Sequence, residues 1–100
     1  MGAILRIYEL QSDGQYSLLQ ENTQMNSICT IKISFDAEYM IIGESSGGAY
    51  LLERNNVQYD TLQNISAPSK YQEGANINKD NSLFVIGDFN GYTRIYQKEN

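Results

Sequence analysis

The sequence predicts an all-β chain built from short antiparallel strands. Apolar runs of four to six residues, such as 83–86, are each bounded by turn residues, which is typical of strands. No window of about 12 residues holds a helical period with caps. The segment 39–53 aligns without a gap with 83–97, a spacing of 44 residues, so the strands also form a repeat.

The repeat has two full copies and one partial copy. Ile42-Gly43 aligns with Ile86-Gly87, and Gly47 aligns with Gly91. One further period upstream of 94–96 lies Arg6-Ile7-Tyr8. A second similarity, between QYSLLQ (15–20) and QYDTLQ (58–63), has a spacing of 43 residues. Short strands with such a period indicate a β-propeller or a similar array.

We expect nine strands, at residues 3–10, 15–21, 27–35, 39–42, 48–54, 57–62, 71–78, 83–86 and 92–98. The first two form a hairpin around Asp13-Gly14, and a polar loop at 22–26 follows. In the third, Ile31, Ile33 and Phe35 alternate onto one face.

The run 39–42 follows a turn at 36–38 and is apolar enough to be buried on both faces. A turn at 44–47 leads into strand 48–54, and Asn55-Asn56 reverses the chain into 57–62. After a loop at 63–70 the last three strands repeat the pattern, with Asn90-Gly91 as the final hairpin turn.

Composition excludes several classes of function. The chain has 100 residues, a net charge of −5, one cysteine and no histidine. The negative charge repels nucleic acids and anionic membranes. The cysteine count allows no internal disulfide and no Cys/His metal site, so we expect no metal and no cofactor. A cytoplasmic location is expected, because neither a signal peptide nor a long apolar run is present.

The segments IKISFDAEYMIIGESSGGAYLLE and ANINKDNSLFVIGDFNGYTRIYQ resemble WD-repeats, the units of four-stranded β-propeller blades. The resemblance covers nearly the whole chain. The family's Trp-Asp positions are held by Tyr8-Glu9, Leu52-Glu53 and Tyr96-Gln97, and its Gly-His pair is absent. The resemblance implies a partial propeller held by apolar packing between blades. Residues 1–14 would end a first blade, 15–54 would form a second and 55–100 a third.

Propellers close with about four to eight blades, so nine strands cannot close alone. Three arrangements remain: the chain is part of a longer protein, it assembles with copies of itself, or it folds as a small open sandwich of two packed sheets.

The resemblance implies a non-enzymatic protein-interaction module or scaffold, whose partners are proteins or further blades in cis or in trans. Its binding rim would comprise Glu44, Lys70, Tyr71, Asp88, Phe89 and Tyr92. An alternative is an architectural edge piece that completes another propeller or a large assembly. A hydrolase-type enzyme is less well supported, because histidine is absent and Cys29 fits a small buried position in its strand, so no catalytic residue is expected.

Overall fold

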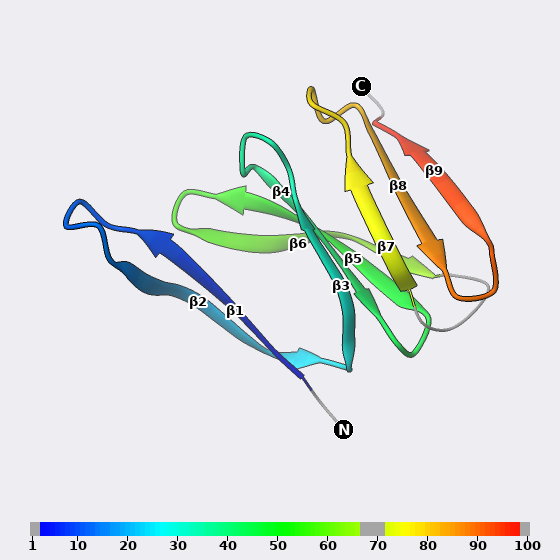
Figure 1. Cartoon of the computed structure of the whole chain (residues 1–100), viewed down its shortest axis with the longest axis horizontal. Coiled ribbons are helices and arrows are strands. Elements are labelled where there is room, and N and C mark those ends of the chain that lie inside the picture. The colour runs from blue at the N-terminus through cyan, green and yellow to red at the C-terminus, as the bar shows by residue number, and fades with distance from the viewer. Residues whose placement is uncertain (1–2, 67–71, 99–100) are drawn as a thin grey trace.

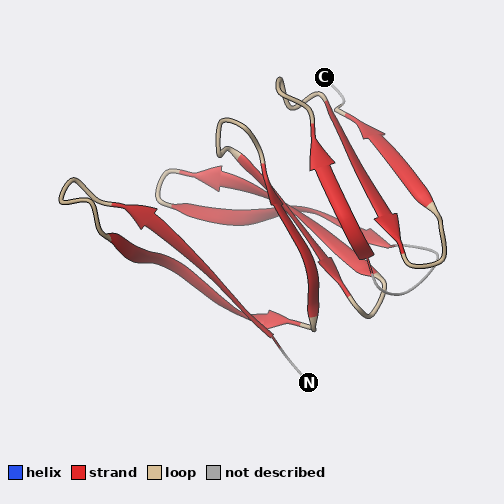
Figure 2. Ribbon diagram, viewed as in Figure 1, coloured by secondary structure: helices blue, strands red, loops and turns tan. Residues whose placement is uncertain are grey.

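Nine β-strands account for most of the described chain, and Figure 2 shows the strands and loops without a helix. The computed structural model describes residues 3–66 and 72–98. The strands are β1 (Ala3–Leu10), β2 (Tyr16–Met25), β3 (Ile28–Ile33), β4 (Tyr39–Glu44), β5 (Gly48–Asn55), β6 (Gln58–Ser66), β7 (Gln72–Ile77), β8 (Leu83–Asp88) and β9 (Thr93–Gln97). The predicted all-β class is therefore confirmed.

The strands form three antiparallel sheets that follow one another across the molecule (Figure 1). Sheet A contains β1 and β2, sheet B contains β3, β4, β5 and β6 in that order, and sheet C contains β7, β8 and β9. Sheet B lies between the other two. Every strand pairs with its neighbour in the sequence, because each connection within a sheet is a tight reversal.

The sheets divide the chain at places that differ from the expected blade boundaries. The boundaries after residues 14 and 54 both fall at hairpins, since Leu10 pairs with Tyr16 and Asn55 pairs with Gln58. Strand β2 also continues through the expected loop 22–26 as far as Met25, which lies opposite Ala3. Polar residues can extend a strand wherever a partner strand satisfies their backbone groups.

The backbone repeats itself at the 44-residue spacing. Gly47 and Gly91 both have positive φ, at 105° and 88°, and each donates its N–H to the carbonyl three residues earlier. Ala37 and Asn81 occupy the corresponding left-handed positions in the β3–β4 and β7–β8 turns, with φ of 64° and 65°. The sequence repeat is therefore a repeat of turn geometry.

Two apolar layers separate the three sheets. Alternate residues of sheet B face opposite sides, as the period of a strand requires. Leu5, Ile7 and Met25 of sheet A pack against one side, which presents Met40, Ile42, Leu52 and Tyr59. The other side packs against Ile86 of sheet C and presents Ile41, Ala49, Leu51 and Ile65. Each sheet-to-sheet junction thus buries its own apolar cluster.

The apolar face expected on the third strand is exposed. Ile31, Ile33 and Phe35 are all open to solvent. Ile31 and Ile33 pair with Ile42 and Met40, so they belong to the side of sheet B that faces sheet A. Among the described residues, sheet A has two strands, which pack over β4, β5 and β6 and leave Ile31 and Ile33 of β3 uncovered.

Candidate protein-binding site

The β8–β9 turn carries two exposed residues of the expected rim. Phe89 is 66% exposed and Tyr92 is 56% exposed, one on each side of Asn90-Gly91. Asp88 Oδ1 accepts hydrogen bonds from the backbone N–H groups of Asn90 (3.1 Å) and Tyr92 (3.0 Å). Asp88 therefore stabilises the turn, which holds two aromatic side chains at the surface.

Glu44 has a different environment and does not belong to an exposed rim. The residue is 2% exposed. Its Oε2 accepts the backbone N–H of Asn26 at 2.8 Å, and its Oε1 accepts the hydroxyl of Ser46 at 3.4 Å. A buried carboxylate needs such donors, because its desolvation is otherwise costly. Glu44 thus joins the β2–β3 connection to the β4–β5 turn.

Three further residues belong to the sequence-based expectations, namely the rim residues Lys70 and Tyr71 and the cysteine Cys29. Lys70 and Tyr71 lie outside the described residues. Cys29 is exposed on β3, and the interpretation of this cysteine as a small buried residue is wrong.

Within residues 3–66 and 72–98 there is no group of three or more Cys, Asp or Glu side chains that could hold a metal ion. The same residues include no helix with the length and hydropathy needed to cross a membrane.

Two aspartates hold the turns that precede β4 and β8. Asp36 Oδ1 accepts the N–H of Glu38 (3.0 Å), and Asp36 Oδ2 accepts the amide of Asn81 (2.9 Å), which links sheets B and C. Asp80 Oδ1 accepts the N–H (3.0 Å) and the hydroxyl (2.7 Å) of Ser82. The hydrogen bond from the Glu38 backbone lowers the pKa of Asp36, and that from the Ser82 side chain lowers the pKa of Asp80.

These lowered pKa values predict acid sensitivity. Their stabilising effect is complete above the unfolded pKa, about 4, and is lost as the pH falls through the lower folded values. We expect the melting temperature to fall on acidification below about pH 4 and to fall less steeply in the double variant Asp36→Asn and Asp80→Asn. Thermal melts monitored by circular dichroism between about pH 2 and 6 measure this. Equal slopes for parent and variant would contradict the assignment.

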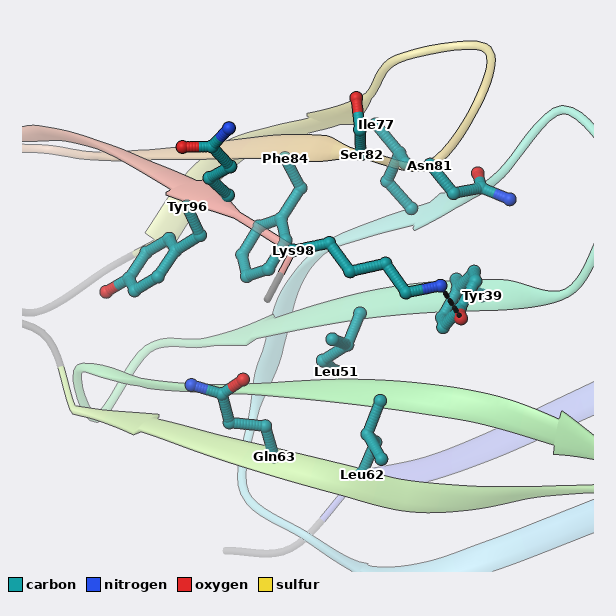
Figure 3. A pocket seen from close by; sticks show the side chains of 11 residues that line it. Tyr39, Leu51, Leu62, Gln63, Ile77, Asn81, Ser82, Phe84, Tyr96 and Lys98 are labelled. Carbon is teal, nitrogen blue, oxygen red and sulfur yellow. Dashed lines mark hydrogen bonds between the residues drawn. The ribbon is translucent and has the colours of Figure 1, made fainter. Parts of the chain in front are cut away.

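A groove of about 400 Å³ lies between sheets B and C and was not predicted from the sequence (Figure 3). Its apolar wall consists of Tyr39, Leu51, Leu62, Ile77, Phe84 and Tyr96. The rings of Phe84 and Tyr96 stack with centroids 4.8 Å apart. Gln63, Asn81 and Lys98 add polar atoms.

Lys98 spans this groove. Figure 3 shows its side chain crossing from the end of sheet C to Tyr39 of sheet B, where Nζ donates to the phenolic oxygen at 3.1 Å. That hydrogen bond raises the pKa of Lys98. The Tyr39 hydroxyl in turn donates to Glu53 Oε2 at 3.2 Å. The groove therefore combines aromatic walls with the ammonium group of Lys98, which crosses it.

The two end sheets expose apolar faces. On sheet A the paired residues Tyr8 and Leu18 point away from sheet B, together with Ile4, Leu10 and Tyr16. On sheet C, Ile95 pairs with Val85 on the side opposite the groove and is 69% exposed. Exposed apolar surface of this kind marks contact sites in many proteins.

Neither a protein-family model, nor a curated protein, nor a solved structure matches the chain.

Proposed function

We propose that this chain is a non-enzymatic protein-interaction module whose sheets are successive blades of a WD-repeat-like β-propeller. The observation that carries the proposal is the recurrence of turns and apolar layers at 44-residue spacing, with an apolar face exposed at each end. A propeller blade has four strands and packs on two neighbours. Sheet B has four strands and two packed faces, whereas sheets A and C have two and three strands.

The exposed outer sides of sheets A and C, called the end faces here, favour the alternative in which the chain completes another propeller or a large assembly. In a propeller the exposed sides of sheets A and C would each contact another blade, and the uncovered residues of β3 would face added strands of sheet A. The partners are therefore further blades, in cis or in trans, or a protein that offers an equivalent surface. A single cysteine and the absence of histidine suit a reducing cytoplasmic compartment and a non-catalytic role.

Light scattering coupled to gel filtration tests the proposal. We expect the 11.3 kDa chain to associate as its concentration rises, because burial of the end faces is favourable. Ile95→Lys should shift the association to concentrations at least about tenfold higher, since a charge on a contact face costs more than about 1.4 kcal/mol. Val57→Lys is the matched control, because Val57 is also 69% exposed but lies in the β5–β6 turn. A monomer at all concentrations would contradict the end-face proposal.

A second contact surface is favoured by one observation, the exposure of Phe89 and Tyr92 on the β8–β9 turn. Aromatic residues are enriched among the residues that dominate binding energy. A photo-crosslinking residue at position 89 or at position 95 separates the two surfaces. Crosslinks to a partner from position 95 support the end face, and crosslinks from position 89 alone support the turn.

A further inference from the structure

Strands β1, β5 and β9 occupy the same position in successive repeats. Among the described residues, β1 and β5 each pair with the strand that follows them in sequence, and β9 does not. β2 pairs with β1 and β6 pairs with β5, whereas β9 pairs only with β8 among the described residues. Asp88 N–H donates to Tyr92 O at 3.0 Å, and Lys98 N–H donates to Ser82 O at 2.7 Å. Even-numbered residues of β9 therefore bond to β8.

The odd-numbered residues Thr93, Ile95 and Gln97 consequently direct their backbone N–H and C=O groups to the outer edge of sheet C. Their counterparts one repeat earlier, Ala49, Leu51 and Glu53, pair with β6. The edge of β9 is thus the place where the next strand of the repeat would add.

Tyr59 shows what the corresponding strand brings to the junction between sheets A and B. Its ring is 3% exposed in the apolar layer, and its hydroxyl donates to the carbonyl of Ala37. The side-chain amide of Gln20 binds the Tyr59 backbone twice, accepting its N–H at 2.6 Å and donating to its carbonyl at 2.8 Å. The guanidinium of Arg54 lies 5.8 Å from the centre of the ring.

The residues that contact Tyr59 have counterparts one repeat later, and these counterparts line the groove between sheets B and C. No described tyrosine occupies the position there that corresponds to Tyr59. Gln63 corresponds to Gln20 in the QYSLLQ and QYDTLQ segments, and Lys98 corresponds to Arg54. Asn81 corresponds to Ala37, the residue that receives the Tyr59 hydroxyl.

An unsatisfied acceptor lies in the same groove. Asn81 Oδ1 is buried and accepts no hydrogen bond from the described residues, although Asn81 Nδ2 donates to Asp36. A buried polar atom without a partner is unfavourable, and a hydroxyl donor entering the groove would satisfy it.

We propose that this groove binds a tyrosine on an extended segment of another polypeptide, which adds to sheet C by pairing with β9. The tyrosine would lie opposite Lys98, as Tyr59 lies opposite Arg54, and would therefore point toward sheet B. Its ring packs on Phe84 and Tyr96, its hydroxyl reaches Asn81, and Gln63 binds its backbone. The proposal rests on the proposed function, since it specifies one partner for a module that acts by protein contact.

The chain itself supplies the probe, a labelled peptide with the sequence VQYDTLQNIS of residues 57–66. Fluorescence anisotropy should show saturable binding to the whole chain. Replacing the peptide tyrosine by alanine should weaken binding at least about tenfold, as for a buried aromatic anchor. Phenylalanine should recover part of this loss because it keeps the ring. Equal affinity for all three peptides would overturn the tyrosine assignment.

Variants of the chain locate the site. Gln63→Ala and Lys98→Ala should each weaken binding by about threefold or more, within the range of single polar contacts. Gln58→Ala is the matched control, because Gln58 is also an exposed glutamine of β6 but does not line the groove. NMR chemical-shift changes on binding should involve the backbone amides of Thr93, Ile95 and Gln97. Shift changes confined to other strands would overturn the placement on β9.

Three further outcomes distinguish this inference from the proposed function and from self-association. If the peptide does not bind while Ile95→Lys still weakens association of the chain, the groove inference fails and the proposed function stands. If the chain is monomeric at all concentrations and the peptide binds, the inference stands and the end-face proposal fails. If peptide affinity falls as chain concentration rises, a second copy occupies the groove, which overturns the assignment to a different polypeptide.

Discussion

Replacing Tyr59 by alanine should lower the free energy of unfolding by about 3–5 kcal/mol, the cost of truncating a buried aromatic residue. The substitution removes the ring from the layer between sheets A and B and removes the hydroxyl that donates to Ala37. Tyr59→Phe keeps the ring and should cost about 1 kcal/mol, the net value of one hydrogen bond. Urea denaturation followed by circular dichroism measures both values.

Tyr16 is the matched control for this substitution. It occupies the same place in QYSLLQ as Tyr59 does in QYDTLQ, but it lies on the outer face of sheet A and is 69% exposed. Tyr16→Ala should therefore change stability by less than about 0.5 kcal/mol. Comparable losses for the two variants would contradict the placement of Tyr59 in the buried layer and of Tyr16 on an outer face.

Replacing Gly43 by alanine should lower the free energy of unfolding by about 1–3 kcal/mol, the usual cost of overpacking. A Cβ atom at Gly43 would lie 2.6 Å from Cβ of Gln72 and 2.7 Å from Cγ2 of Thr30. Gln72 belongs to β7 and its side chain is buried, so sheet C would have to move away from sheet B. Equilibrium denaturation measures the loss of stability.

Gly87 provides the comparison, because it lies one repeat later on β8. Among the described residues, the nearest atoms to a Cβ atom there would be 3.9 Å away, and no described sheet packs on that face of sheet C. Gly87→Ala should therefore be close to neutral in the isolated chain, and the difference between the two variants measures how closely sheets B and C approach. Loss of stability of the same size in both would contradict the packing described for Gly43.

The sequence was most informative where turn chemistry and strand period agree. The run 83–86 followed by Asn90-Gly91 led to a hairpin because Gly91 can adopt positive φ, and the structure contains β8 and β9 at that place. The polar end of β2 was missed, since residues 22–24 have no apolar alternation and are ordered by pairing with β1.

The candidate site was predicted less well, because burial depends on which sheets are present. Phe89 and Tyr92 are exposed at the turn, whereas Glu44 is buried by contacts with Asn26, which is distant in sequence. Ile31 is exposed because the two described strands of sheet A do not reach it, and no pattern within β3 reveals this. The repeat itself contained a signal for the groove. The strand at 48–54 is followed by a strand at 58–63, and the groove lies where the corresponding strand would follow 92–98.

The hydrogen bonds between neighbouring sheets also set the length of the chain loops that close when the sheets pack together. Gln20 and Tyr59 are 39 residues apart, and the pairs Glu9–Arg54 and Asp36–Asn81 are each 45 residues apart. Each junction therefore closes a loop of about one repeat, and the entropy lost depends on that loop length rather than on the length of the whole chain. Each further repeat of this kind would close a loop of the same length. The sequence separation of contacts, and with it the topological limit on folding rate, would therefore not grow with the number of repeats.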